Sequence, residues 1–169
     1  MISRNTAKVD AAKAFSADAA MDSLARLLVT RERSAVEVQG RLRDKGYKPQ
    51  AISSAIDRAL ACGLLDDQRF GCNFVKDRLS RGWGQQRIEQ ELLRFGIVAE
   101  NIKGYPHEYI TEENQLERAL DALKKHRTNS KNPQQSAYRF LIGRGYSSDI
   151  ASTAAKQVRQ KRAPERHAD

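Results

Sequence analysis

The sequence predicts an all-α protein made of three tandem three-helix modules. Three glycines, Gly46, Gly96 and Gly145, lie 50 and 49 residues apart, and each closes a short amphipathic segment. Apolar residues occur four and eight positions before each glycine, on one face of a helix; they are Leu42 and Val38, Leu92 and Ile88, and Leu141 and Ala137. Alternating runs rich in Val, Thr and aromatic residues, which are typical of strands, are missing. Such a repeat is typical of helical units that pack on their neighbours.

The first module is predicted over residues 21–65, after a loose N-terminal tail of small and polar residues at 1–20. Ser34, with Glu37 three residues later, forms a capping-box pattern that starts a helix. Gly46 can end that helix in the left-handed conformation. Pro49 suits the first turn of the next helix, which is predicted to bury Ile52, Ile56 and Leu60 and to stop at Gly63.

The second module is predicted over residues 66–109. Asp66 and Asp67 are adjacent acids at a helix start, where free backbone N–H groups favour carboxylates, so we interpret them as caps rather than metal ligands. Gly82 and Gly84 allow a turn into the next helix, and a shorter helix is expected from Ala99 to Lys103.

The third module is predicted over residues 110–158 and is followed by a basic C-terminal tail at 159–169. Thr111 is the expected cap of its first helix. A polar loop at 128–132 precedes Pro133, which restarts a helix, and Ser147 or Ser148 is expected to cap the last helix.

The net charge of +9 is unevenly distributed along the chain. Residues 21–65 and 110–158 each carry 8 basic and 5 acidic side chains, whereas residues 66–109 carry 7 of each. Positive ends around a neutral centre favour a polyanionic partner, such as nucleic acid or a nucleoprotein. A basic protein with no such partner is the alternative interpretation of this charge.

Cysteine usage and hydropathy indicate a cytoplasmic protein. Cys62 and Cys72 are the two cysteines and lack CxxC spacing, so we expect reduced core thiols rather than a disulfide or a zinc site. The N-terminus lacks the apolar run of a signal peptide, and no stretch is apolar enough to span a membrane.

Motifs of catalysis are missing from the sequence. GxxxxGK[ST], GxSxG and HExxH do not occur. His107, His126 and His167 are scattered, as surface histidines are. We therefore expect no enzyme, no metal and no cofactor.

Arg78 lies within the apolar stripe of its predicted helix, beside Phe74 and Val75. A buried guanidinium must be paired, because burying a lone charge is very costly. Asp67 and Glu91 are the candidate partners for an internal bridge between two helices. Direct contact of Arg78 with a binding partner is the alternative.

Two basic groups are candidate contacts for a partner or for DNA. The first group surrounds the glycine-rich turn, where arginines beside an indole suit stacking, phosphate contact or a protein interface; it comprises Arg81, Trp83, Arg87 and Arg94. Trp83 could instead fill a junction between helices. The second group could line one side of a groove, or form a solvated face; it comprises Lys124, Lys125, Arg127, Arg139 and Arg144.

The order and spacing of several motifs resemble the RecX family, bacterial regulators of the RecA recombinase, over residues 21–158. The densest stretch is Gly63-Leu64-Leu65-Asp66-Asp67-Gln68-Arg69-Phe70, followed by Arg78, Arg81-Gly82-Trp83-Gly84, Arg87-Ile88, Glu91-Leu92 and Gly96-Ile97. The first module matches through Arg33-Ser34, Glu37, Leu42 and Lys45-Gly46-Tyr47, and the third through Arg139-Phe140-Leu141 and Arg144-Gly145-Tyr146. The chain departs from the family pattern at Gln85, where proline is common, and at Val38, where leucine is usual.

The resemblance implies an elongated, curved array of modules that acts without a cofactor, and we expect it to be a monomer. Family members bind the RecA filament on single-stranded DNA, in its groove, and suppress ATP hydrolysis, strand exchange and the co-protease role. They thereby limit recombination, DNA repair by that route and the SOS response. The alternatives are a helix-turn-helix-like DNA-binding protein, with Gln85, Gln86 and Gln90 as base-reading candidates, and a scaffold for an unrelated protein.

Overall fold

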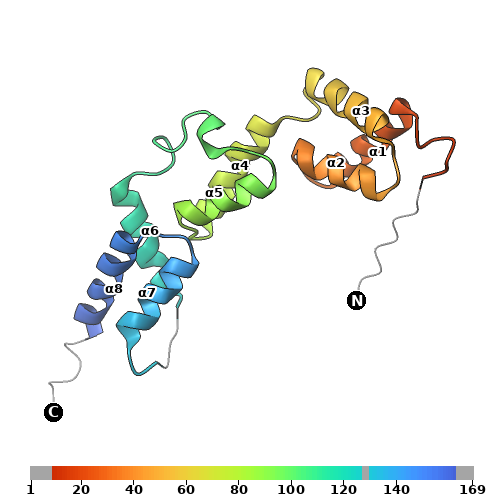
Figure 1. Ribbon diagram of the computed structural model, residues 1–169. Coiled ribbons are helices and arrows are strands. Elements are labelled where there is room, and N and C mark those ends of the chain that lie inside the picture. The colour runs from red at the N-terminus through yellow and green to blue at the C-terminus, as the bar shows by residue number, and fades with distance from the viewer. Residues whose placement is uncertain (1–8, 127–129, 163–169) are drawn as a thin grey trace, which may run out of the picture. The chain divides into compact units, whose positions relative to one another are not determined.

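The regular secondary structure is all helical in the part of the chain that the structure describes. The computed structural model describes residues 9–126 and 130–162, with side chains as far as Gln157 (Figure 1). Its α-helices are α1 (Ala17–Thr30), α2 (Ala35–Asp44), α3 (Pro49–Ala61), α4 (Asp67–Ser80), α5 (Gln85–Arg94), α6 (Glu112–Lys124), α7 (Pro133–Gly143) and α8 (Ser148–Arg162). A single 3-10 turn, η1 (Ala99–Asn101), stands where a longer helix to Lys103 was predicted. These elements confirm the all-α fold class.

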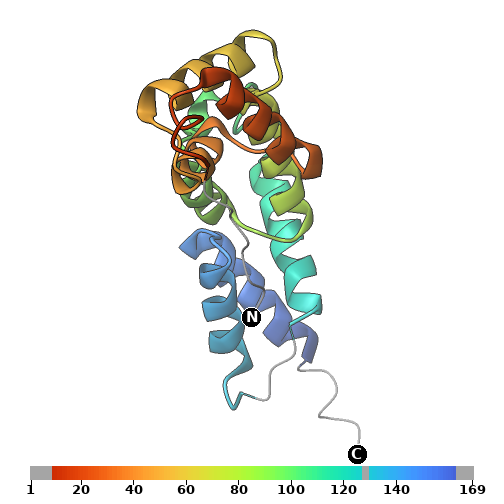
Figure 2. The ribbon, with the colours of Figure 1, turned by 90° about the vertical axis from the view of Figure 1, so that its right-hand side faces the viewer.

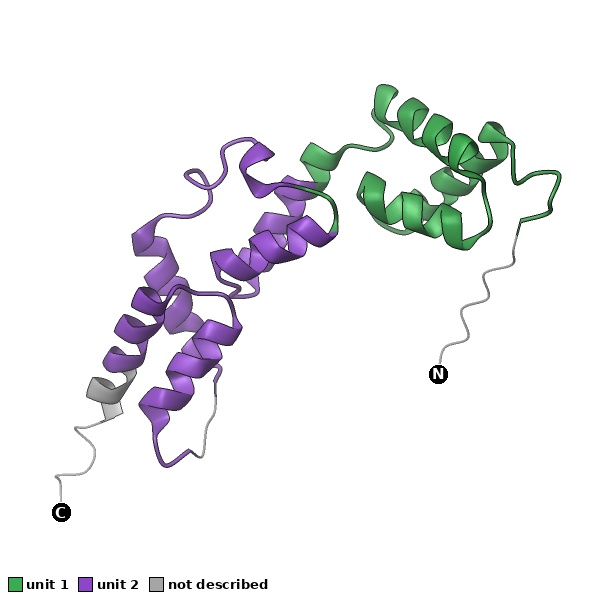
Figure 3. Ribbon diagram, in the orientation of Figure 1, with its two compact units in different colours: residues 1–70, 95–97 green, residues 71–94, 98–169 purple. Residues whose placement is uncertain are grey.

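The chain divides into two compact units (Figure 3). Unit 1 comprises residues 1–70 and 95–97, and unit 2 comprises residues 71–94 and 98–169. The boundary between them falls inside α4. Each unit is larger than one predicted module, and the division into three modules stays a prediction.

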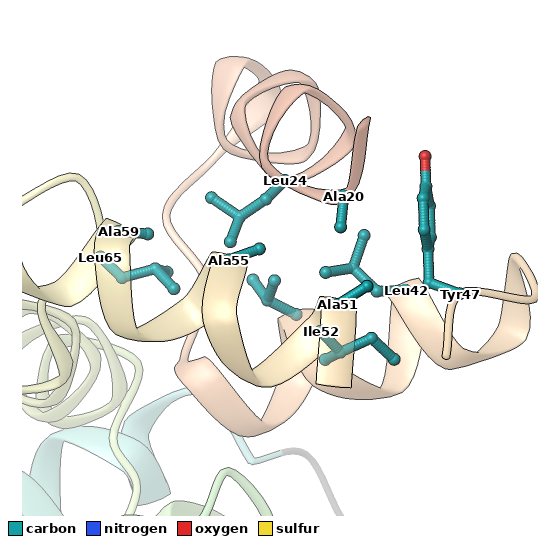
Figure 4. Packing of buried hydrophobic residues seen from close by; sticks show 10 residues of the cluster. Ala20, Leu24, Leu42, Tyr47, Ala51, Ile52, Ala55, Ala59 and Leu65 are labelled. Atoms are coloured by element: carbon teal, nitrogen blue, oxygen red, sulfur yellow. The ribbon is translucent and has the colours of Figure 1, made fainter. Parts of the chain in front are cut away.

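The core of unit 1 lies where α1, α2 and α3 pack together, and small side chains bring α1 close to α3 (Figure 4). Its buried residues include Leu24, Leu42, Ala51, Ile52, Ala55, Ala59 and Leu65. The predicted apolar face of α3 is correct at Ile52 and wrong at Leu60, which is 42% exposed. Alanines face the core instead, because α1 leaves too little room for longer side chains there.

A buried core of unit 2 lies among α6, α7 and α8, which pack on one another (Figures 1 and 2). Alanines again predominate, with one large buried phenol in Tyr146; the cluster is Ala119, Leu123, Ala137, Leu141, Tyr146, Ala151, Ala154 and Ala155. Close packing of small residues lets these short helices bury most of their facing surfaces.

The internal repeat is visible in both units. Gly46, Gly96 and Gly145 all have positive φ angles, of 96°, 75° and 87°, as expected for helix ends that only glycine adopts without strain. The residues four positions earlier, Leu42, Leu92 and Leu141, are completely buried, and so are Val38 and Ile88, while Ala137 is 2% exposed. The repeated apolar face is therefore the core face.

Polar caps start several helices as predicted. The Ser34 hydroxyl accepts a hydrogen bond from the Glu37 N–H (3.2 Å), and Asp66 accepts one from the Arg69 N–H (2.8 Å). Thr111 forms a full capping box with Asn114, and Ser147 caps α8. The capping box expected at Ser34 is only half formed, because the Glu37 carboxylate pairs with Arg31 and Arg33 instead.

The N-terminal segment requires a correction for residues 9–20, which were expected to be a loose tail. The Val9 N–H donates to the Lys45 carbonyl, and the Lys48 N–H donates to the Ala14 carbonyl, both at 2.9 Å. Ser16 caps α1, which begins at Ala17. At the other end of the chain, α8 extends to Arg162, into the segment expected to be a tail.

Candidate interaction site

Two glycine turns of unit 2 dock directly on each other, backbone to backbone. The Gly84 N–H donates to the Arg144 carbonyl (2.8 Å), and the Gln86 N–H donates to the Gly145 carbonyl (3.1 Å). A Cβ atom on Gly84 would lie 2.2 Å from the Gly145 carbonyl carbon, so no side chain fits at this position. The glycines therefore permit a joint between the turn that precedes α5 and the turn that follows α7.

This joint brings predicted basic residues together. The Arg144 Nη1 atom donates to the Arg81 carbonyl (2.8 Å), and the Tyr146 hydroxyl donates to the Gly82 carbonyl (3.3 Å). Arg81 and Arg144, which lie 63 residues apart in the chain, thus become neighbours.

Trp83 lies against two guanidinium groups. The Arg87 guanidinium carbon is 3.9 Å from the centroid of the indole ring, and that of Arg78 is 4.9 Å away. Arg78 also lies 4.5 Å from the Phe74 ring. We call Arg78, Trp83 and Arg87 the arginine–tryptophan cluster. Cation–π contacts of this kind hold the planar groups in a fixed arrangement.

The expected ion pairs of Arg78 were wrong. Arg78 forms its salt bridge with Asp77, its neighbour in the chain. Asp67 instead accepts a hydrogen bond from the Ala35 N–H (2.9 Å), at the start of α2, and Glu91 pairs with Arg94 (2.8 Å). The aromatic rings provide the remaining favourable contacts of this half-buried guanidinium, whose Nε atom has no hydrogen-bond partner among the described residues.

A pocket of about 680 Å³ lies beside this joint, between the end of α4 and the helices α6 and α7. We call it the basic pocket. Phe140 contributes an aromatic wall, and the polar side chains that line the pocket are Ser80, Arg81, Arg118, Asp121, Lys125, His126 and Arg144. The His126 ring stacks on Phe140 with centroids 4.2 Å apart, and the Arg144 guanidinium lies 4.9 Å from the same ring.

Positive charge in the basic pocket is poorly neutralised. Its single carboxylate, Asp121, is bound by Lys124 (2.7 Å), which lowers the pKa of Asp121 and raises that of Lys124. Arg81 pairs with Asp77 (2.9 Å). Within the described residues, the other three cations, Arg118, Lys125 and Arg144, form no salt bridge.

Arg118 is the candidate that sequence reasoning missed. Its Nη2 atom donates to the Asn114 side-chain oxygen, and burial lowers its pKa. The signal was present in the spacing, because residues 118, 122 and 125 share one face of a helix. Only the fold, however, places Arg81 and Arg144 opposite that face.

The other predicted contact residues that the structure describes lie outside the basic pocket, at different places in the structure. Arg87 and Arg94 line a second, smaller hollow of about 330 Å³, together with Glu91 and Ile142. Arg139 is exposed on α7, and Arg127 lies outside the described residues. Lys124 and Lys125 are adjacent in sequence, but only Lys125 lines the basic pocket.

Groups for covalent or metal chemistry are sparse in the described part of the chain. No three or more His, Cys, Asp and Glu side chains there could hold a metal ion. Cys62 and Cys72 are both free, and Cys62 is exposed, which corrects its expected place in the core. None of the described helices is both long enough and apolar enough to cross a membrane.

Comparison with known proteins relates both the sequence and the fold to one family. Residues 20–58 match the family model "RecX, first three-helix domain", and residues 66–104 match "RecX, second three-helix domain". The regulatory protein RecX of Legionella pneumophila (strain Corby) is 33% identical over 144 residues, which cover 83% of this chain and 95% of that protein.

Two crystal structures share the fold. RecX from Lactobacillus salivarius superposes with a TM-score of 0.69 at 20% identity, over 85% of this chain and 97% of that one. A second structure, of a regulatory protein RecX, gives a TM-score of 0.73 at 20% identity, over 88% of this chain and 80% of that one. With this similarity of fold and the sequence identity to its members, the chain belongs to the RecX family of regulatory proteins.

Proposed function

We propose that this protein is a non-enzymatic regulator that binds the RecA filament on single-stranded DNA, in its groove, and inhibits it. The affected activities are ATP hydrolysis, strand exchange and co-protease action. In this proposal the protein acts in the cytoplasm as a monomer and needs no cofactor, because the ATP belongs to its partner.

The observation that carries the proposal is the gathering of cations and an aromatic ring in unit 2. The arginine–tryptophan cluster and the basic pocket both adjoin the turn formed by Gly82, Trp83 and Gly84. A surface with fixed guanidinium groups and a half-buried indole suits contact with a nucleoprotein, whose phosphates and acidic side chains are both anionic. Membership of a family of regulatory proteins supports the same function.

The geometry suggests a division of roles. Arg87 is held by Trp83 and by the Gly143 carbonyl (3.2 Å), so it would lose little side-chain entropy on binding. Arg94 and Lys124 are exposed, and each pairs with an acid on its own helix. We assign Trp83 and its arginines to a central contact, and Lys124 and Lys125, at the C-terminal end of α6, to a longer-range electrostatic contact.

The test is ATP hydrolysis by the host recombinase on single-stranded DNA, with this protein titrated from far below to equal molar ratio. We expect inhibition that excess free DNA does not relieve. Inhibition well below one molecule per protomer would indicate capping or impaired assembly, and inhibition near saturation would indicate groove occupancy. Unchanged hydrolysis at every ratio would contradict the proposal.

The double variant Lys124→Glu/Lys125→Glu tests the electrostatic contact in the same assay. It should weaken filament binding and flatten the dependence of that binding on salt, because a protein that neutralises fewer phosphates releases fewer counterions. Normal inhibition by this variant would remove Lys124 and Lys125 from the interface. Binding to random duplex and to an enriched sequence then separates the helix-turn-helix alternative, which requires a sequence preference.

A further inference from the structure

The basic pocket has a counterpart at the equivalent place in unit 1. That second pocket, of about 660 Å³, adjoins the turn at Gly46 as the basic pocket adjoins the turn at Gly145, and its charged lining is Asp10, Lys13, Asp22, Arg26 and Lys45. We call it the N-terminal pocket. Lys45 and Arg144 occupy the same repeat position, 99 residues apart, and the same spacing relates Arg26 to Lys125 and Asp22 to Asp121.

The two pockets differ in charge although they correspond in position. Three basic and two acidic side chains line the N-terminal pocket, and Lys45 there donates to the Ser23 hydroxyl (2.8 Å). Four basic side chains and a histidine line the basic pocket, with one acid that Lys124 already binds. The repeat position of Arg118 is occupied by Ala19 in the N-terminal pocket. The excess of positive charge therefore belongs to one pocket and is not a property of the repeat.

We propose that the basic pocket binds the phosphate groups of a nucleotide, free or within a DNA strand. Arg118, Lys125 and Arg144 are the direct phosphate ligands, because these three cations have no carboxylate partner in the described chain. The half-buried guanidinium of Arg118 gains most, since a desolvated cation is strongly stabilised by a paired anion. Phe140, with His126 stacked on it, provides an aromatic wall beside the phosphate ligands.

The volume of the pocket agrees with this ligand class. About 680 Å³ lies within the range of small-molecule sites and accommodates a nucleotide rather than an isolated ion. Phosphate recognition by several basic side chains around a compact pocket needs no base-specific contact. We therefore expect little dependence on base identity. The inference rests on the proposed function only in placing this pocket on the surface that meets the filament.

The test compares Lys125→Ala with Arg26→Ala, its matched control at the same repeat position of the N-terminal pocket. Both side chains are exposed, so both variants should fold, which circular dichroism checks. Binding of ADP is measured by titration calorimetry, and binding of a fluorescent oligothymidylate by anisotropy, both without recombinase. We expect Lys125→Ala to weaken binding of at least one probe about tenfold, as the loss of a charge-assisted contact does. Arg26→Ala should stay within about twofold of the wild-type protein.

The two probes distinguish the sources of the phosphate. Affected ADP binding assigns the pocket to free nucleotides, and affected oligonucleotide binding alone assigns it to strand phosphates. In the second case the slope of log affinity against log salt should fall by about 0.7 for Lys125→Ala and remain unchanged for Arg26→Ala. Equal losses in both variants, or no binding of either probe, would overturn the inference. Failure to inhibit the recombinase, with phosphate binding intact, would count against the proposed function alone.

Discussion

The turns Lys45-Gly46-Tyr47 and Arg144-Gly145-Tyr146 are the same local structure in two different surroundings. In unit 1 the turn faces the segment before α1, and a Cβ atom on Gly46 would meet only the Val9 side chain, at an ordinary 3.7 Å. In unit 2 the turn faces the backbone of the first turn of α5, and a Cβ atom on Gly145 would lie 2.4 Å from the Arg87 amide nitrogen. Two turns of the same conformation and closely similar sequence thus make a loose contact in one unit and a close joint in the other.

This difference explains why the candidate contacts gather in unit 2. The close joint holds Arg81 and Arg144 side by side and places Trp83 against Arg87. At the looser turn, the Val9 N–H donates to the Lys45 carbonyl, as the Gly84 N–H does to the Arg144 carbonyl. The segment at Val9 therefore provides the backbone donor that the turn at Gly84 provides in unit 2. It brings no arginine with it, whereas the turn at Gly84 is flanked by Arg81 and Arg87.

The largest expected effect comes from alanine at the two glycines. Gly46→Ala should cost about 1–2 kcal/mol, the penalty of a left-handed non-glycine residue. Gly145→Ala adds a backbone clash, which costs about 1–3 kcal/mol more. Amide hydrogen exchange, measured separately in α2–α3 and α6–α7, gives both values in the full chain. Gly84→Ala is the control for packing alone, because Gly84 has no positive φ. Equal losses at Gly46 and Gly145 would refute the distinction between the two contacts.

Removing the hydroxyl group of Tyr47 or Tyr146, which occupy equivalent repeat positions, should destabilise the protein less than the glycine substitutions. Here the larger loss is expected in unit 1. The Tyr47 hydroxyl donates to the Ala19 carbonyl at 2.9 Å, whereas that of Tyr146 donates to the Gly82 carbonyl at 3.3 Å. Tyr47→Phe should therefore destabilise unit 1 by about 1 kcal/mol, and Tyr146→Phe should destabilise unit 2 by less. The same exchange measurement distinguishes them. A larger loss for Tyr146→Phe would show that the joint depends on this hydrogen bond more than its length indicates.

Alkaline pH should produce the smallest effect, and it should reduce the stability of unit 2. Burial raises the pKa of Tyr146 above its ordinary value of 10.0, although Arg118 and Arg144 partly oppose the shift. Above pH 10 the unfolded chain releases this proton while the folded chain retains it, so stability decreases as pH rises. Tyr146→Phe should lose less stability in unit 2 between pH 9 and 11 than the wild-type protein. Identical pH profiles would mean that Tyr146 ionises equally easily in both states.

Local interactions explain the parts of the fold that the sequence predicted well. The caps at Ser34, Asp66 and Thr111 depend on residues within one helical turn, and so do the helix ends at the repeat glycines. The buried face of each repeat follows from its spacing. The N-terminal segment was misjudged because its polar, alanine-rich composition resembles a tail, whereas its hydrogen bonds go to Lys45 and Lys48.

The candidate site was predicted in composition but not in arrangement. Arg81, Lys125 and Arg144 were identified from charge and from the resemblance to a family, and the fold places them around one pocket. The ion pair of Arg78 was predicted wrongly with Asp67 or Glu91, because the adjacent Asp77 carboxylate is already within reach of the guanidinium. Lys124 and Lys125 were grouped as neighbours in sequence, but adjacent helical residues point about 100° apart.

By itself, the sequence determined the helices, their caps, the repeat and the family, because each of these depends on residue types at short or regular spacing. Tertiary structure alone decided which turn docks closely and which cations share a pocket with Arg118. The physical reason is the approach of Gly84 to Gly145, where two backbone segments 61 residues apart in the chain meet without side chains between them. The spacing of residues along the chain does not predict that contact. The hydrogen bonds donated by the Gly84 and Gln86 N–H groups make the contact specific.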